Sequence, residues 1–403
     1  MPENLRPGLF RLMAISVGTV VANLYYAQPL LPDLAREFHL SVTATGAVAM
    51  LGMAGAGIGQ LIFVPLGDIR ERRRLIVSMI AAAAVALAFM ASAQNAAWLM
   101  FATFACGVSA SVNHITTPYA AHLAPAGQRG RVVGTVISGL LIGVLVSRTY
   151  SGWVGEVFGW RAVFASATLL MIAMAILMRR WLPEGPPESS LTWPQLMASV
   201  IPLWRTQPVL RQAVLVNTLM FGAFSGFWTA MVFFVEGPPY NYTSRGAGLF
   251  GLIGAAGALC APLAGRLTDR SGGHKNVLYA IYGVMLAFAI LGLFGTNLAG
   301  FILGVIILDL AQQFGHVSNQ TRIYGLVPEA RSRLNMVYMT CSFSGAAAGS
   351  YLSTYWWHRA GWTGVCIFSI ALMIAALAIW WRSNPATLAS RADLQPASAP
   401  KPL

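Results

Sequence analysis

PLGDIRERRRL, residues 65–75, returns in altered form as RLTDRSGGHKN, residues 266–276, and a shift of 201 residues places Asp68 on Asp269. A shift of 202 residues gives further matches, in which His114 falls on His316, Arg131 on Arg333, Gly143 on Gly345, Gly159 on Gly361 and Trp160 on Trp362. A nearly constant offset across separate segments indicates an internal duplication. The sequence therefore predicts two structural repeats that together make up most of the chain.

Long apolar runs surround both copies of this stretch. The 403-residue chain is 57% hydrophobic and only 10% charged, whereas a typical soluble domain is about 25% charged. Runs of about 20 residues, the length that crosses a bilayer, recur near 9–32, 43–66, 75–93, 97–120, 131–155, 161–181, 209–235, 246–266, 275–295, 298–322, 333–356 and 363–382. This pattern predicts an all-α membrane protein with twelve transmembrane helices in two six-helix, pseudo-symmetric halves.

The basic residues are distributed unevenly between the two sides of these runs. Of 26 Lys and Arg residues, 21 lie in segments on the side of the N-terminus, and the net charge is +13. Cytoplasmic segments carry such an excess, so both termini are expected in the cytoplasm, in a bacterial inner membrane. A nucleic-acid-binding protein would instead gather its basic residues on one soluble face, so no nucleic-acid partner is expected.

Composition also divides the chain. We expect an N-terminal six-helix half over residues 1–181 and a C-terminal six-helix half over 209–382. LPEGPPESSLTWPQ, residues 182–195, is polar and rich in proline, which is typical of a linker. The cytoplasmic linker is therefore placed at 182–208, with a short amphipathic helix near 193–204. The tail over 383–403 is expected to be disordered.

The two related loops and the twelve runs resemble the major facilitator superfamily over essentially the whole chain. The family signature is G-x-L-a-D-r-x-G-r-R, and Val64 and Glu71 stand here at its two glycine positions. NLYYAQPLLPDL (23–34), SNQTRIYGLVPEARSRLN (318–335) and GVLVSRTYSG (143–152) resemble the branch of arabinose-efflux and drug-exporter-like permeases. The span-four arginine and the span-five proline that exporters of this superfamily often carry are replaced by Thr103 and Val144.

The resemblance implies that these loops latch the cytoplasmic side of the protein. The implied gate residues are Asp68, Arg72, Arg73, Asp269 and Arg270. A carboxylate near helix N-terminal amides and a cation would be stabilised there. The alternative is that RERRR only fixes the topology of the chain.

A polar stripe runs along the tenth expected span. Asp309, Gln312, Gln313, His316 and Gln320 follow the spacing of one helical face. Polar groups at membrane depth are unfavourable in lipid, so this face should line a cavity or pack on other polar groups. Burial and a nearby cation act in opposite directions on a carboxyl group. We therefore expect Asp309 to couple transport to protons, the alternatives being a permanently hydrogen-bonded charge or a site for a cationic substrate.

Arg148 is the single Lys or Arg residue that lies away from both ends of an apolar run. Its own helix offers no acid at i±4, so a partner must come from another helix, from the substrate or from water. The hypothesis is a role in binding or gating within a cavity, and the alternative is that the side chain snorkels to the outer interface.

Four spans should supply the rest of a substrate cavity. In the family that the chain resembles, helices one, four, seven and ten line it. Aromatic and amide groups on these spans suit an amphipathic solute, although each aromatic residue taken alone is more often a packing residue and the histidines more often scaffold. The residues are Asn23, Tyr25, Tyr26, Gln28, Asn113, His114, Asn217, Ser225 and Trp228.

These features predict a secondary transporter that works by alternating access, with proton-coupled efflux of a small organic solute as its function. Import or passive uniport of such a solute is the alternative. No P-loop, H-E-x-x-H or G-x-S-x-G motif is present, so we expect neither ATP use nor an enzyme, and no cofactor or metal. A channel is disfavoured by the duplication. We expect a monomer in the lipid bilayer.

Overall fold

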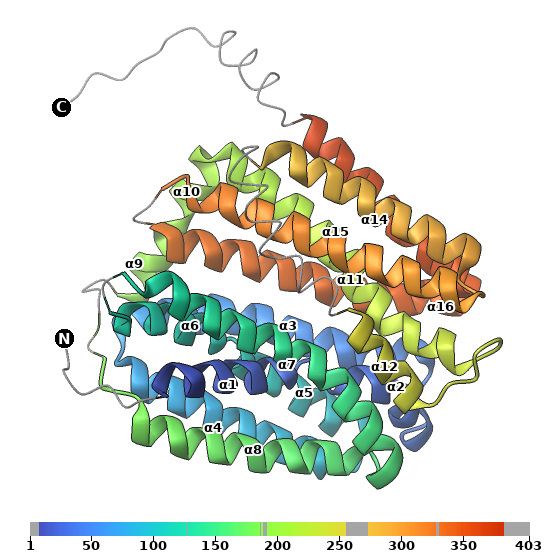
Figure 1. Cartoon of the computed structure of the whole chain (residues 1–403), viewed down its shortest axis with the longest axis horizontal. Helices are drawn as coiled ribbons and strands as arrows, with labels where there is room; N and C mark the ends of the chain where they lie inside the picture. Colours follow the sequence, from blue (N-terminus) through green and yellow to red (C-terminus); the bar gives the residue numbers. More distant parts are fainter. Residues whose placement is uncertain are drawn as a thin grey trace, which may run out of the picture.

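Every element of the described chain is a helix. The computed structural model describes residues 8–125, 127–185, 187, 192–254, 273–327 and 330–382, and these contain no strand. With the labels of Figure 1, the helices are α1 (Leu9–Ala22), α2 (Ala27–Glu37), α3 (Val42–Ile69), α4 (Arg72–Ala91), α5 (Ala96–Ala110), α6 (Asn113–Leu123), α7 (Arg129–Phe158), α8 (Trp160–Trp181), α9 (Trp193–Ala198), α10 (Val200–Thr206), α11 (Pro208–Glu236), α12 (Ser244–Ile253), α14 (His274–Phe294), α15 (Leu298–Tyr324) and α16 (Arg331–Arg382).

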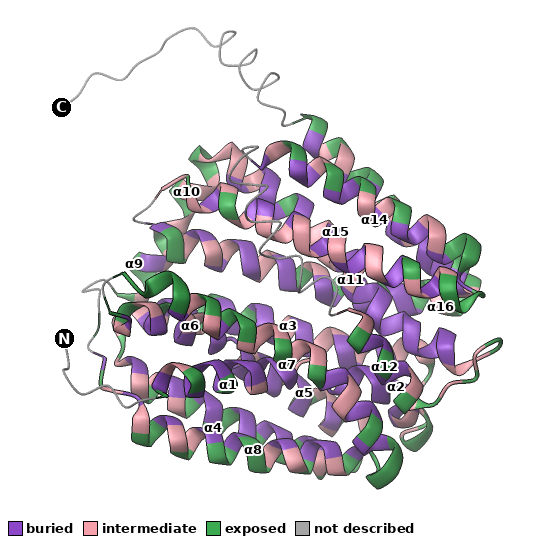
Figure 2. Cartoon of the chain, viewed as in Figure 1, coloured by how far each residue is buried: buried purple, intermediate pink, exposed green. Residues whose placement is uncertain are grey.

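Ten helical segments of the described residues are long and apolar enough to cross a membrane. Figure 2 shows exposed residues along the outer surface of the bundle, and large apolar side chains such as Phe101, Leu169 and Leu293 are among them. An apolar exterior of this kind suits lipid better than water. The predicted all-α membrane fold is therefore confirmed.

Two features explain how these ten segments relate to the twelve expected spans. α16 contains both expected spans of the region 333–382. Its helical geometry is interrupted at Ala360 and Gly361, and this interruption separates the two spans. The expected span over 246–266 begins as α12, and its remainder lies outside the described residues.

Two of the membrane segments are broken. α1 and α2 are separated at residues 23–26, where most backbone N–H groups bond three residues back instead of four. Pro29 accounts for this position, because a proline ring clashes with the carbonyl group four residues earlier, here that of Tyr25. α5 and α6 are separated in the same way at residues 111–112. Each break thus lies beside residues predicted to face a cavity.

The helices form two groups, α1–α8 and α11–α16, that lie against each other (Figure 1). Within each group, glycines allow two helices to cross closely. A Cβ at Gly143 of α7 would lie 2.1 Å from the Gly18 carbonyl oxygen of α1, and one at Gly349 of α16 would lie 2.0 Å from that of Gly222 in α11. Only a residue without a side chain fits such a contact.

The crossings agree with the repeat read from the sequence. The offset of 202 residues places Gly345 of α16 on Gly143, and a Cβ at Gly345 would lie 2.1 Å from the Thr218 carbonyl oxygen of α11. Gly345 and Gly349 are four residues apart, about one helical turn, so both lie on the same face of α16.

The groups touch each other mainly through α3 with α16 and α7 with α12. Gly46 of α3 lies against Thr354 of α16, and Gly248 of α12 lies against Gly152 of α7. The offset of 202 residues relates one pair to the other, since it places Gly46 on Gly248 and Gly152 on Thr354. This fits the duplication read from the sequence. We call this end of the bundle the far end, and the end that carries α9 and α10 the linker end (Figure 1).

α9 and α10 lie within the segment predicted as a linker. The short helix expected near 193–204 is present as these two helices, which meet at Ser199. Trp193 donates a hydrogen bond of 3.2 Å from Nε1 to the carbonyl oxygen of Ile62, so α9 rests on α3. The predicted disordered tail, 383–403, lies outside the described residues.

Candidate functional site

Arg148 lies inside the bundle, between helices of both groups. Its guanidinium carbon is 4.7 Å from the ring centre of Tyr25 in α1–α8 and 4.1 Å from that of Trp228 in α11–α16. Its Nε donates a hydrogen bond of 2.9 Å to Oε1 of Gln28. Because only 4% of the residue is exposed, the side chain does not reach a membrane surface. The snorkelling alternative is therefore wrong.

Small residues of α12 set the position of Arg148. A Cβ at Gly248 would lie 2.5 Å from the Arg148 carbonyl oxygen, and a Cβ at Gly251 would lie 2.8 Å from the Arg148 Cβ. Thr149 also donates a hydrogen bond of 3.2 Å to the carbonyl oxygen of Gly248. α7 thus crosses α12 at the arginine itself, and the backbone contact holds the side chain at the boundary between the groups.

Asp309 of α15 lies near this arginine without forming an ion pair with it. The residue is 9% exposed, its Oδ2 has no hydrogen-bond partner among the described residues, and it takes part in none of the ion pairs found there. The charges of Arg148 and Asp309 act on each other electrostatically. A Cβ at Gly254 would lie 3.3 Å from Oδ1 of Asp309 and 3.4 Å from Cζ2 of Trp228. Trp228 therefore neighbours both charges.

We call Tyr25, Gln28, Arg148, Trp228 and Asp309 the central cluster. All five are buried. Several of its polar atoms have no hydrogen-bond partner within the described chain, and the same holds for two buried amides at neighbouring positions, Asn23 and Gln312. Buried polar groups normally find partners, so this concentration marks the region where a polar ligand or water would be stabilised.

The predicted stripe on α15 divides into two parts. Asp309 and Gln312 are buried. Oδ2 of Asp309 and both polar side-chain atoms of Gln312 have no hydrogen-bond partner among the described residues. Farther along, the hydroxyl of Tyr338 in α16 lies 3.1 Å from Nδ1 of His316, and Gln320 donates 3.2 Å to Oδ1 of Asn335, also in α16. The second part thus connects helices by hydrogen bonds, as the scaffold alternative for the histidine requires. Gln313, between the two parts, is half-buried.

The remaining predicted cavity residues make their contacts in different parts of the bundle. The Nδ2 of Asn217 donates 2.7 Å to Ser342, and Ser225 lies 2.8 Å from Ser350, so both residues join α11 to α16. They lie within one group, and no hydrogen bond in the described structure joins their side chains to the central cluster. Tyr26 packs its ring 5.8 Å from that of Tyr150.

The fourth span contributes a polar pair near its break. Asn113 is buried, and its Oδ1 has no partner among the described residues. His114 is half-buried and interacts electrostatically with His316 of the other group. The structure thus brings near each other two histidines that the offset of 202 residues relates.

At the linker end, Asp68 connects the two groups. Its Oδ2 accepts a hydrogen bond of 3.3 Å from Ser332 in the first turn of α16, and its Oδ1 lies 3.7 Å from Nη2 of Arg72. Arg72 also donates from Nε to the carbonyl oxygen of Gly67 at 3.0 Å. A carboxylate, a cation and a helix N-terminus thus lie together here, and the implied latch stays a prediction. Asp269 and Arg270 lie outside the described residues.

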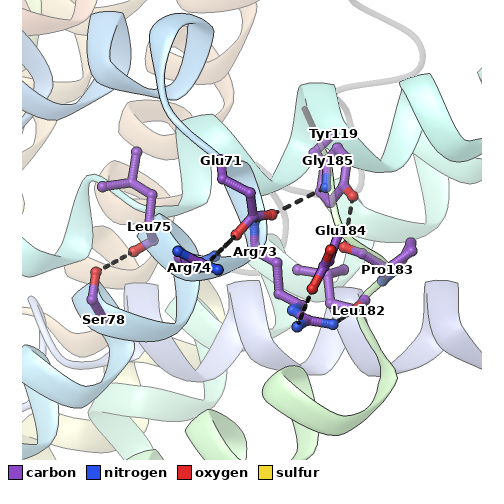
Figure 3. A network of polar contacts seen from close by, with 10 residues as sticks. All are labelled: Glu71, Arg73, Arg74, Leu75, Ser78, Tyr119, Leu182, Pro183, Glu184 and Gly185. Carbon is purple, nitrogen blue, oxygen red and sulfur yellow. Dashed lines mark hydrogen bonds and ion pairs between the residues drawn. The ribbon is translucent and has the colours of Figure 1, made fainter. Parts of the chain in front are cut away.

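A residue that gates the space between the groups should contact the other group, but Arg73 contacts the start of the linker. Its Nη2 donates 2.9 Å to Glu184, which precedes the linker helices and does not belong to α11–α16. Figure 3 shows this pair within a network that also includes Glu71 and Tyr119. The hydroxyl of Tyr119 donates 2.9 Å to the carbonyl oxygen of Pro183. The network ties the start of the linker to the first group, so Arg73 does not bridge the groups here.

Sequence reasoning missed the polar contacts at the far end. Arg36 forms an ion pair with Glu236, and Ser244 donates a hydrogen bond to Asp33. Thr243 donates 2.5 Å to Oε2 of Glu156. Each contact joins α1–α8 to α11–α16 or to the loop between α11 and α12. The residues are single charged or hydroxyl side chains in α2, near helix ends or in the loop between α11 and α12, and no spacing in the sequence relates them across the groups.

Comparisons with known proteins bear on the whole chain. A profile of the Major Facilitator Superfamily matches residues 13–305 and 247–402. The uncharacterized transporter YgaY of Escherichia coli O157:H7 is 42% identical over 94% of this chain and 96% of its own length.

Solved structures agree in fold at low sequence identity. A bacterial homologue of the human lysosomal transporter Spinster, inward-facing and unoccupied, is 13% identical and covers 99% of this chain and 100% of its own, with a TM-score of 0.72. The human organic anion transporter MFSD10 is 17% identical and covers 93% of this chain and 100% of its own, with a TM-score of 0.68.

Proposed function

Because the chain belongs to the major facilitator superfamily and is a membrane transporter, we propose that it exports a small organic solute in exchange for protons by alternating access. Asp309 carries the proton, and the central cluster binds the solute. The observation that carries this proposal is the buried Asp309 carboxylate, whose Oδ2 has no partner among the described residues and lies near an arginine held by both groups.

The chemistry of a buried carboxyl group supports the role of Asp309. A charge without a partner is unfavourable inside a protein, and a proton removes that charge. A neighbouring guanidinium favours the ionised form instead. A carboxyl group between these two influences can take a proton from one side of the membrane and release it on the other as access alternates. The proximity of Arg148 supplies the second influence.

Alternating access requires two bodies that move relative to each other. We propose the halves 1–181 and 209–382 as these bodies, with 182–208 as the linker between them. Arg148 and Trp228 meet at their boundary, so a relative movement would change the surroundings of the solute. The excess of 21 of 26 basic residues on one side supports cytoplasmic termini in a bacterial inner membrane, and we propose a monomer as the working unit.

Proteoliposomes loaded with a pH-sensitive dye test the exchange. A panel of sugars, amino acids, organic cations and organic anions is added, and proton movement is recorded for each compound. We expect at least one compound to drive proton movement through the wild-type protein. Asp309→Asn should abolish that movement while downhill exchange of the same compound persists, because the amide cannot carry a proton.

Glu37→Gln is the matched control. It also removes one carboxylate, but from an exposed pair with Arg161, and it should move protons at the wild-type rate. Unchanged proton movement in Asp309→Asn would exclude the proposed coupling residue. Solute movement without proton movement in the wild-type protein would favour the uniporter alternative.

A further inference from the structure

We propose that the central cluster selects small zwitterionic solutes, of which α-amino acids are the simplest class. This inference rests on the proposed role of the cluster as the solute site. Its basis is a pair of opposite buried charges that lie close together, each with a polar atom that has no partner within the described chain.

The positive side of the site is the free edge of Arg148. The rings of Tyr25 and Trp228 lie over its guanidinium, and Nε is used by Gln28. Nη2 is buried and has no acceptor among the described residues. An arginine is always charged and its N–H groups donate in a fixed plane. A carboxylate of the solute would therefore be bound at this edge by a charge-assisted hydrogen bond.

The negative side of the site is Oδ2 of Asp309. It is buried, and no donor reaches it from the described residues. The side chain lies more than 4.0 Å from the arginine nitrogens, the limit for an ion pair, so the two residues do not neutralise each other directly. An ammonium group of the solute would supply the missing donor and take the place of the exchanged proton.

A solute with a single charge fits this pair less well. An organic anion would pair with Arg148 but would bring its charge near Asp309, and an organic cation would do the reverse. Either one leaves a buried charge without a partner, which is unfavourable. A zwitterion satisfies both charges at once and keeps the net charge of the site unchanged. The side-chain amides of Asn23 and Gln312, which have no partner in the described part of the chain, offer further hydrogen bonds to such a polar solute.

Two matched sets of probes test the inference on detergent-purified, full-length protein at neutral pH, by isothermal titration calorimetry. Each set holds a zwitterion, the amine without its carboxylate, and the acid without its ammonium group. One set is phenylalanine, 2-phenylethylamine and 3-phenylpropanoate, and the other is leucine, 3-methylbutylamine and 4-methylpentanoate. We expect the zwitterion of at least one set to bind about 10- to 100-fold more tightly than its two partners, as charged hydrogen bonds predict.

Two substitutions assign the charges. Arg148→Gln should weaken binding of the zwitterion to the level of the amine, and Asp309→Asn should weaken it to the level of the acid. A merely structural role would weaken all three probes alike. Arg161→Gln, which removes an exposed arginine paired with Glu37, should leave all affinities unchanged. The comparison of the probes in wild-type protein decides the matter even if a variant does not fold.

Tighter binding of an amine or an acid than of its zwitterion would overturn the inference, and so would the absence of binding by every probe. The assay involves no proton gradient, so it is independent of the coupling test. Selective zwitterion binding without proton movement would refute proton exchange and retain this inference.

Discussion

At the scale of single residues, Glu71 shows how a departure from a family pattern acquires a structural role. The residue stands where the resemblance has a glycine, and its carboxylate caps α4 by accepting from the N–H groups of Arg73 and Arg74 at 2.8 and 2.7 Å. It also accepts from the N–H of Gly185 at 3.0 Å (Figure 3). One side chain thus begins a helix and holds the linker.

The protonation of Glu71 follows from these contacts. Burial raises the pKa of the Glu71 carboxyl, but hydrogen bonds from the Gly185, Arg74 and Arg73 amides outweigh it, so the pKa lies below its ordinary value. A group with a lowered folded-state pKa contributes stability above its unfolded-state pKa. That contribution is lost as the pH falls through the lowered value. The linker contact should therefore persist at neutral pH and weaken in acid.

We predict that Glu71→Ala destabilises the protein by about 0.5–2 kcal/mol, the usual effect of losing a helix cap. Hydrogen exchange over residues 182–185 should become faster, because the Gly185 amide loses its acceptor. Glu184→Ala is the control: it breaks only the partly exposed ion pair with Arg73, for which about 0–1 kcal/mol is typical. Unchanged exchange at 182–185 in Glu71→Ala would contradict the assigned contact.

At the scale of elements, the surroundings of α7 change along its length. Its early part is accessible at Gly134, its middle crosses α1 at Gly143, and its later part crosses α12 at Arg148 and Gly152. The sequence predicts the helix from its apolar content. It does not predict which glycine makes which crossing, because that depends on how neighbouring helices pack.

The same substitution at two glycines of α7 tests the crossing with α1. Gly143→Ala should destabilise the protein by about 1–3 kcal/mol, as overpacking does, because its Cβ would meet the Gly18 carbonyl oxygen at 2.1 Å. Gly134→Ala is the control: no atom lies within 4 Å of its Cβ, and the higher helix propensity of alanine should stabilise it by up to about 1 kcal/mol. Thermal unfolding in detergent measures both. Equal melting temperatures would argue against the close crossing.

At the scale of the whole molecule, contacts between the two groups differ between the ends of the bundle. The far end combines close glycine contacts, at Gly46 and Gly152, with the ion pair of Arg36 and Glu236. The linker end is joined through the hydrogen bond between Asp68 and Ser332. If access alternates as proposed, the far-end contacts must separate when the solute site opens on that side.

We predict that Arg36→Gln shifts the population toward separation at the far end. An exposed ion pair contributes at most about 1 kcal/mol, so the ratio of the two states should change by up to about fivefold. Spin labels at the exposed positions His39 and Asn241, on opposite groups, report the distance by pulsed electron resonance. Arg161→Gln removes a comparable pair with Glu37 inside one group and should leave the distances unchanged. A distance distribution identical to that of the wild type in Arg36→Gln would exclude a role of the Arg36–Glu236 ion pair in holding the far end closed.

The sequence by itself determined the helical membrane fold, the duplication and the polar face of α15, because hydropathy, periodicity and repetition are local properties of the chain. Only the tertiary structure decided that Arg148 meets Trp228 and Gln28, that Arg73 binds Glu184, and that Gly143 meets Gly18. These contacts join residues between 80 and 125 positions apart in the chain. Their geometry follows from how helices pack side by side, which no single stretch of sequence contains.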